Sequence, residues 1–292
     1  MEYHKTSEIR RQGQLYGIWV RFRRNKLALI GLIVFLLIVF GALFADLFID
    51  YRTAAISQNI SQRLQKPSAQ HIFGTDMFGR DLFARIVFGS RYSLGISMGV
   101  MFIALVSGVI IGSTAGYYGG TIDGFIMRII DVFLSLPSSL LAIAVVAALG
   151  QRTINIIIAL SITQIPRLTR VVRSVVLPLR GHEYIEAAIS NGASNKYIIG
   201  RHILPNAIGP IIVQTTLNVS FVILTISGLG FIGLGVPPPA PEWGSMAAQA
   251  QPFLRDHPYL AIIPGIAICI CAMSLNLVGD GLRDALDPKL KN

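Results

Sequence analysis

Residues 27–45 read LALIGLIVFLLIVFGALFA, a run of 19 residues without one charged side chain. A helix needs about 20 predominantly apolar residues to cross the hydrocarbon core of a bilayer. The run is too long for the apolar part of a cleavable signal peptide, and the 26 residues before it are polar and basic. The stretch therefore predicts a membrane protein whose first spanning helix lies within residues 27–48.

The rest of the chain has the same apolar character. Of its 292 residues, 53% are hydrophobic and 14% are charged, whereas about 25% of the residues in soluble domains are charged. A shorter apolar run, Ile154–Leu168, is interrupted by Gln164 and Pro166. Four more runs are long enough to cross a bilayer: Leu94–Tyr117, Ile129–Leu149, Ala207–Gly235 and Tyr259–Leu277. The sequence thus predicts an all-helical membrane protein with five or six spans.

The distribution of basic residues decides between five and six spans. The formal net charge is +10, and cytoplasmic loops of membrane proteins carry an excess of Lys and Arg. Six spans with a cytoplasmic N-terminus place most basic residues in the cytoplasm. With five spans and a cytoplasmic N-terminus, most basic residues lie outside the cell. With the opposite orientation, the RFRRNK cluster of residues 21–26, directly before the first span, lies outside. We therefore expect six spans with both termini in the cytoplasm, and the positive charge does not indicate a nucleic-acid partner.

This topology divides the chain into five regions. They are a cytoplasmic tail (1–26), a first span (27–48), an extracytoplasmic loop (49–91), a membrane core (92–281) and a second cytoplasmic tail (282–292). The extracytoplasmic loop carries six basic residues, which do not fit the usual excess of Lys and Arg on the cytoplasmic side. Because Asp76 and Asp81 are interleaved with them, we expect a folded loop whose charges pair with one another.

Several residues inside the spans suggest packing or transport roles. Gly108, Gly112 and Gly116 recur at four-residue spacing, so they share one helix face and predict close contact with another helix of the chain. Arg128 and Asp131 are three residues apart and are expected to pair. Polar residues in or beside spans either line a pathway or form hydrogen bonds between helices, the commoner use. The candidates for a pathway are Asp131, Asn218, Asn276 and Asp280.

No arrangement of residues predicts an enzyme. The histidines are scattered without metal-ligand spacing, and Cys269 and Cys271 lie two residues apart within an apolar run, where we expect them to pack as hydrophobic residues. No Lys follows a Gly, so the chain lacks the glycine-rich loop that holds nucleotide phosphates. We expect no catalytic residue, bound metal or cofactor in this chain.

Residues 183–205, EYIEAAISNGASNKYIIGRHILP, form a polar segment between apolar runs, and the topology places it in the cytoplasm. The pattern predicts a helix over Glu183–Asn191, with Gly192 as its left-handed C-terminal residue. Ser194 is suited to cap a second short helix, and Pro205 marks the turn into the next span. We expect Tyr184, Ile185 and Tyr197 to anchor the pair. The segment suits either docking into a groove of another protein or an ordinary interfacial linker.

Several motifs together resemble one transporter family. Glu186-Ala187-Ala188, Gly192 and Leu204-Pro205 resemble the E-A-A-x3-G-x9-I-x-L-P loop of ABC-importer permeases, although His202 stands where the pattern has Ile. Three further segments resemble signatures of the dipeptide, oligopeptide and nickel branch: Phe73–Asp81, Gly235–Gly244 and Asn276–Pro288. These motifs cover nearly the whole chain, which is most similar to the second permease subunit of such importers.

The resemblance implies the fold and the partners. The fold is that of a type I importer permease, with a five-span core over residues 92–281 and one additional N-terminal span. The partners are a homologous second permease, two ATPase subunits that bind ATP and magnesium, and an extracytoplasmic binding protein. The expected location is a prokaryotic inner (plasma) membrane, and the expected substrates are dipeptides or oligopeptides. Nickel-chelate and glutathione permeases share the signatures, and a stand-alone channel or secondary transporter is the alternative of another class.

The resemblance also assigns roles within residues 183–205, which would dock into the ATPase. Glu186 would pair with a basic group, Ala187 and Ala188 would permit close approach, and Gly192 would make the bend. The implied interface residues are Glu183, Tyr184, Glu186, Ala187, Ala188, Gly192, Ala193, Tyr197, Leu204 and Pro205.

Overall fold

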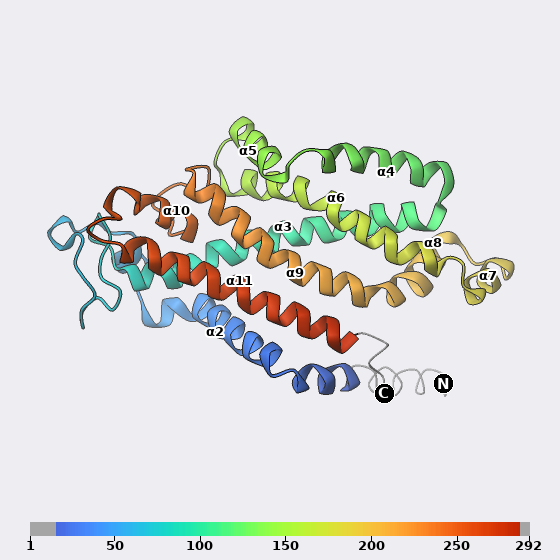
Figure 1. Ribbon diagram of the computed structural model, residues 1–292, viewed down its shortest axis with the longest axis horizontal. Helices are drawn as coiled ribbons and strands as arrows, with labels where there is room; N and C mark the ends of the chain where they lie inside the picture. The colour runs from blue at the N-terminus through green and yellow to red at the C-terminus, as the bar shows by residue number, and fades with distance from the viewer. Residues whose placement is uncertain (1–15, 287–292) are drawn as a thin grey trace.

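The computed structural model describes residues 16–286, and their secondary structure is helical, without strands. Of the predicted tails, 1–26 and 282–292, residues 1–15 and 287–292 lie outside the described part, whereas 16–24 and 282–286 are helical. Figure 1 shows long helices that run roughly along one axis of the molecule. These are α2 (Lys26–Phe48), α3 (Leu82–Tyr118), α6 (Thr153–Leu179), α9 (Leu204–Phe231) and α11 (Tyr259–Leu286). The shorter helices are α4 (Gly120–Ser135), α5 (Ser138–Leu149), α7 (Glu183–Ser190), α8 (Asn195–Tyr197) and α10 (Trp243–Gln249).

Four stretches among the described residues are long and apolar enough to cross a membrane. They are α2, α3, α11 and the continuous helical stretch Asn195–Phe231, which includes α9. The pair α4 and α5 meets the same criterion only when taken together. Helix α6 does not meet it, because Gln164 and several arginines make it more polar. The all-helical membrane class is therefore confirmed, with four such stretches or five if the α4–α5 pair forms one span.

Helix α3 begins earlier than the sequence predicts. It begins at Leu82, so residues 82–91, which we assigned to the extracytoplasmic loop, are helical. The carboxylate of Asp81 caps this end by accepting a hydrogen bond from the amide of Ala84. At 1.5 Å per residue, its 37 residues span about 55 Å. A bilayer core is about 30 Å thick, so the first turns of α3 have room to project beyond it.

The apolar run Ile129–Leu149 does not form one straight helix. It is divided between α4 and α5, which meet at an angle of 85°. The break falls at Leu136, whose backbone is extended (φ −88°, ψ 134°), directly before Pro137. A proline disfavours helical backbone in the residue before it and donates no amide hydrogen bond. A single straight span here, which hydropathy alone suggests, is therefore wrong.

Close packing of α3 against α6 forms the centre of the molecule. A Cβ atom on Gly112 would lie 2.6 Å from the carbonyl oxygen of Thr169 and 2.7 Å from Cβ of Val172. A Cβ atom on Gly108 would lie 3.1 Å from Leu168, and one on Gly116 would lie 2.9 Å from Val176. The small face of α3 therefore accepts a ridge of side chains at four-residue spacing on α6. This confirms the predicted intramolecular packing of the three glycines.

We expect Gly112→Val to lower the stability of the protein. Its branched side chain would collide with the α6 backbone, and overpacking of this kind costs typically about 1–3 kcal/mol. Gly95→Val is the matched control, because no atom outside its own helix lies within 4 Å of a Cβ at this position of α3. Thermal unfolding of the purified complex measures the difference, and equal unfolding temperatures for the two variants would contradict the packing model.

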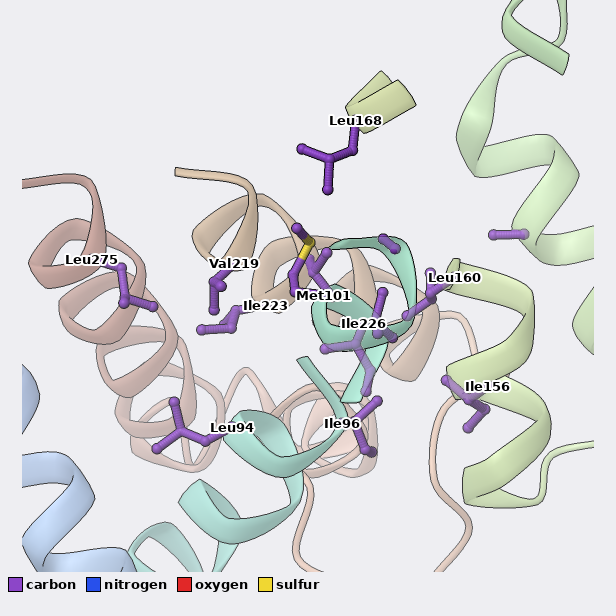
Figure 2. Close-up of a cluster of buried hydrophobic side chains, with 14 of the residues drawn as sticks. Leu94, Ile96, Met101, Ile156, Leu160, Leu168, Val219, Ile223, Ile226 and Leu275 are labelled. Atoms are coloured by element: carbon purple, nitrogen blue, oxygen red, sulfur yellow. The ribbon is translucent and has the colours of Figure 1, made fainter. Parts of the chain in front are cut away.

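The core joins four helices into one unit. Figure 2 shows buried side chains from α3, α6, α9 and α11 gathered at the centre of the bundle. The labelled residues are Leu94, Ile96 and Met101 from α3; Ile156, Leu160 and Leu168 from α6; Val219, Ile223 and Ile226 from α9; and Leu275 from α11. Helix α2 lies outside this core against α11, where Gly281 contacts Ala28 and Gly31 contacts Leu277.

A buried carboxylate organises the loop between α9 and α11. Glu242 is fully buried and caps α10, accepting hydrogen bonds from the amides of Gly244 (2.9 Å) and Ser245 (2.8 Å). Gly230 of α9 leaves the space for it, since a Cβ there would lie 2.7 Å from Glu242 Oε2. Burial raises the pKa of the Glu242 carboxyl, and these amide hydrogen bonds act against the rise. Glu242 thus fixes α10 against the end of α9.

We expect Glu242→Ala to destabilise this loop. The change removes a helix cap and leaves two buried amides without acceptors, a loss of about 1–3 kcal/mol. Asp256→Ala removes a carboxylate from an exposed position of the same loop and is the control. Proteolysis of the loop in membrane vesicles measures the effect. Cleavage of the Glu242→Ala protein no faster than of the control would count against the capping role.

Candidate functional site: the segment between α6 and α9

Helices α7 and α8 project from one end of the bundle, opposite the end that carries α10 (Figure 1). Three side chains attach this α7–α8 segment, which we define as residues 183–205. Ile185, Ile198 and Ile203 are all fully buried and belong to the main hydrophobic core. The rest of α7 is exposed apart from Ala188, which is partly buried. The segment is therefore a protrusion fixed at its base and open along its outer face.

The bend after α7 has the predicted backbone geometry. Helix α7 ends at Ser190, Asn191 is its C-cap, and Gly192 has φ +78°. The amide of Gly192 donates to the carbonyl of Ile189 (2.9 Å), and that of Ala193 donates to Ala188 (3.1 Å). Only glycine adopts this left-handed conformation at low cost. The prediction that Gly192 forms the bend is confirmed.

The second helix also begins as predicted but continues differently. Ser194 caps α8, accepting a hydrogen bond from the amide of Tyr197 at 3.4 Å. A π-helical turn, Ile198–Ile203, then joins α8 directly to α9. Leu204 and Pro205 are the first two residues of α9, so Pro205 lies within a continuous helical stretch and the predicted turn there is wrong. Pro205 lies in the first turn of α9, where proline is tolerated.

The exposed face of the segment combines aromatic, small and acidic side chains. Tyr184 and Tyr197 are 42% and 54% exposed, and each packs against a histidine, His182 and His202 respectively. They do not anchor the segment as predicted; Ile185 does so, together with Ile198 and Ile203. Glu183 and Glu186 lie in the first turn of α7, where the helix dipole favours them. Neither carboxylate has a hydrogen-bond or ion-pair partner among the residues that the structure describes.

Two polar contacts join the segment and the adjoining end of α6 to α3. The hydroxyl of Tyr117 donates to the side chain of Asn195 (2.8 Å), and Arg180 Nη1 donates to the carbonyl of Tyr118 (3.0 Å). A displacement of α7 and α8 would therefore be transmitted to α3, and through the continuous helix to α9. Sequence reasoning missed these residues, because each pairs with a group far away along the chain.

The pathway candidates do not form a single cluster. Asp131 pairs with Arg170 of α6 (2.5 Å), so the predicted pair with Arg128 is wrong. Helix α6 lies alongside α4 and presents several arginines to it; Arg173 likewise pairs with Asp123 (2.5 Å). These pairs join two helices, which a pattern within one helix does not reveal.

The remaining candidates lie on α9 and α11. Asn276 of α11 accepts a hydrogen bond from Ser220 of α9 (2.5 Å), and Asn218 accepts one from Gln214 of its own helix (3.1 Å). Asp280 is exposed. The Asn276 contact is thus one between helices, and a role of these groups in a pathway stays a prediction.

Family models match two parts of the chain. Residues 108–292 match the model described as "Binding-protein-dependent transport system inner membrane component". Residues 13–67 match the model of the N-terminal TM domain of oligopeptide transport permease C. The two matches together include the α7–α8 segment and the first apolar helix.

Characterised relatives and solved structures agree with these models. The chain is 47% identical to the dipeptide transport system permease protein DppC of Alkalihalophilus pseudofirmus, over 93% of this chain and 89% of the relative. It is 43% identical to the oligopeptide transport system permease protein OppC of Bacillus subtilis (93% and 88% covered) and 42% identical to the glutathione transport system permease protein GsiD of Escherichia coli (94% and 91%). An inward-facing structure of the MetNI methionine ABC transporter matches with a TM-score of 0.59 at 18% identity, covering 70% of this chain and 98% of the other, which shows a common fold.

Proposed function

This chain belongs to the family of binding-protein-dependent transport system inner membrane components, and we propose on that basis that it is a permease subunit of an ATP-driven ABC importer of dipeptides or oligopeptides. It forms half of the translocation pathway, and a homologous second permease forms the other half. ATP and magnesium bind to two separate ATPase subunits, so this chain is neither an enzyme nor the carrier of a cofactor. An extracytoplasmic binding protein delivers the substrate.

The exposed α7–α8 segment is the observation that carries this proposal. A protruding pair of short helices with small residues on its surface suits insertion into a groove of a partner protein. Glu186 is exposed and available to a basic group of an ATPase, while Ala187 and Ala188 let the two surfaces approach closely. The aromatic rings of Tyr184 and Tyr197 provide apolar contact area beside them.

The geometry suggests how movement of the ATPases reaches the membrane. Closure of the ATPase pair around ATP displaces the α7–α8 segment. The Tyr117–Asn195 and Arg180–Tyr118 contacts pass this displacement to α3, and the unbroken helix from Asn195 passes it to α9. The bundle then alternates between inward-facing and outward-facing states. The segment acts as one body in this mechanism, because Gly192 fixes the angle between its two helices.

We further propose six spans with both termini in the cytoplasm of a bacterial cell. Helix α6 supplies the fourth span: its 27 residues reach about 40 Å, and it packs against α3 at the centre of the bundle (Figure 2). The α4–α5 pair supplies the third span in bent form. This topology puts the α7–α8 segment in the cytoplasm and α10, at the opposite end, outside (Figure 1).

Reconstitution tests the transport function. Proteoliposomes that contain this chain, its second permease and the ATPases should accumulate a labelled dipeptide when they receive ATP and the cognate binding protein. Vanadate should stop this uptake. Uptake by this chain alone and without ATP would identify a channel or secondary transporter instead. The same assay should be run with two alternative substrates. One is labelled glutathione, because a glutathione permease is 42% identical to this chain; the other is a nickel chelate.

A further inference from the structure

A buried charged cluster joins three separate segments at the outer end of the molecule. Arg80 and Arg85 are each 1% exposed, and both contact Asp76, which is 8% exposed. Arg80 Nε lies 2.6 Å and Arg85 Nε 3.4 Å from Asp76 Oδ2. Arg80 also reaches α10, donating from Nη2 to Oε1 of Gln249 at 3.1 Å. The loop before α3, the first turn of α3 and α10 meet at this point.

The cluster holds more positive than negative charge. Arginine stays protonated in proteins, so two guanidinium groups share one carboxylate. The other titratable group close to Arg85 is the phenol of Tyr51, which is neutral at pH 7. One positive charge is thus buried without a counter-charge among the described residues. A buried charge without compensation is costly, which favours the binding of an anion at this place.

Two hydrogen-bond donors in the cluster have no acceptor among residues 16–286. Arg85 donates from Nη1 to the carbonyls of Ala55 (2.9 Å) and Pro239 (3.3 Å), but its Nη2 is buried without a partner. The Arg80 contact fixes the side chain of Gln249 with Oε1 toward Arg80. Its Nε2 therefore points elsewhere, and this atom is also buried without a partner. Both groups are donors only, so an acceptor alone satisfies them.

A small cavity adjoins this cluster. Its volume is about 20 Å³, and Asp76, Arg85 and Gln249 form its polar wall. Room for one water requires about 10–15 Å³, so this volume suits about one water-sized particle. The remaining wall is mainly apolar, formed by Leu82, Met246 and Leu260 among others. The carboxylate oxygens of Asp76 already accept hydrogen bonds from Arg80 and backbone amides and form an ion pair with Arg85, which limits their repulsion of an anion.

We propose that this cavity binds one monovalent inorganic anion of the size of chloride, held by Arg85 Nη2 and Gln249 Nε2. The anion supplies the missing negative charge and accepts from both donors. Through these two side chains it fastens α10 to the first turn of α3. The site is independent of the transported substrate and of the α7–α8 segment, so its presence does not depend on the proposed function.

Anion dependence of thermal unfolding tests the site. The detergent-purified complex, with all its subunits, is heated in chloride or gluconate at constant ionic strength. We expect the unfolding temperature to rise with chloride by about 2–4 °C and to saturate, as mass action requires for one site. Bromide should replace chloride, and its anomalous scattering in a crystal should give a peak between Arg85 and Gln249. An ordered water there instead of bromide, or identical unfolding in both salts, would overturn the proposal.

One substitution separates this site from a general salt effect. Gln249→Glu places a carboxylate beside Arg80, which Gln249 already contacts, and neutralises the cluster. The chloride dependence should therefore disappear while the complex stays stable in gluconate. Gln251→Glu adds the same charge at an exposed position of the same loop and should keep the full chloride dependence. Retention of the dependence in Gln249→Glu, or its loss in both variants, would contradict the assignment of the anion to this cavity.

Discussion

Gly192→Val is expected to abolish ATP-driven uptake while the protein still inserts into the membrane and binds its second permease. The backbone of Gly192 has φ +78°. Left-handed backbone costs an L-residue about 1–2 kcal/mol, and a β-branched side chain suits it least. The population that keeps the native bend would fall roughly 5- to 30-fold or more. Helices α7 and α8 would then lose their fixed relative orientation and would no longer move as one body.

The measurement is uptake into proteoliposomes with ATP hydrolysis followed in parallel. We expect ATP hydrolysis to continue without uptake, since the substitution lies in the α7–α8 segment of the permease and not in the ATPase. Gly192→Asn is the matched control, because asparagine tolerates left-handed backbone better than other residues with a side chain. It should keep most of the uptake. No atom lies within 4 Å of a Cβ at this position, so size alone does not distinguish the two variants. Normal uptake by the valine variant would refute the lever mechanism.

Glu186→Lys is expected to detach the ATPase subunits from the membrane complex. The carboxylate is exposed in the first turn of α7 and has no partner among the described residues. If it pairs with a basic group of the ATPase, its loss costs at least about 2 kcal/mol, or roughly 30-fold in affinity. Reversal of its charge adds repulsion. Uptake should be lost together with the ATPase.

Co-purification of the ATPase with the permease measures this effect. Asp256→Lys makes the same change of charge in the loop at the opposite end of the molecule, where the residue is also exposed, and is the control. It should leave the ATPase content unchanged. An ATPase content that is equal in both variants would show that Glu186 makes no essential contact with the partner.

Local sequence features predicted much of the architecture correctly. The uncharged run after Lys26 became α2 almost residue for residue, because a continuous apolar helix is decided within its own sequence. The left-handed residue Gly192 and the cap Ser194 were also predictable, since both depend on local backbone geometry. The prediction that the loop before α3 pairs its own charges is confirmed by the contact of Asp76 with Arg80.

Features that depend on distant segments were not predictable. The pairing of Asp131 with Arg170 requires α4 and α6 to lie side by side, which neither segment reveals alone. The division of one apolar run at Pro137 has a local cause, but hydropathy does not register backbone geometry. The contact of Tyr117 with Asn195 likewise joins residues far apart in sequence. Burial of Arg80 and Arg85 depends on segments that meet only in the folded chain, since Arg80 contacts Gln249 and Arg85 contacts the carbonyls of Ala55 and Pro239. The sequence predicted paired charges in the loop but not the burial of these arginines.

Site-directed cross-linking tests the central claim, that the α7–α8 segment docks into the ATPase, most directly. Cys269 and Cys271 are first replaced by alanine, and Ala187, exposed on α7, is replaced by cysteine. In the assembled transporter, a thiol-directed photoreactive cross-linker at position 187 should join this chain to an ATPase subunit. The same reagent at Gln70→Cys, in the outer loop, should not. Cross-links to the ATPase from position 70 but not from position 187, or from neither, would contradict the account.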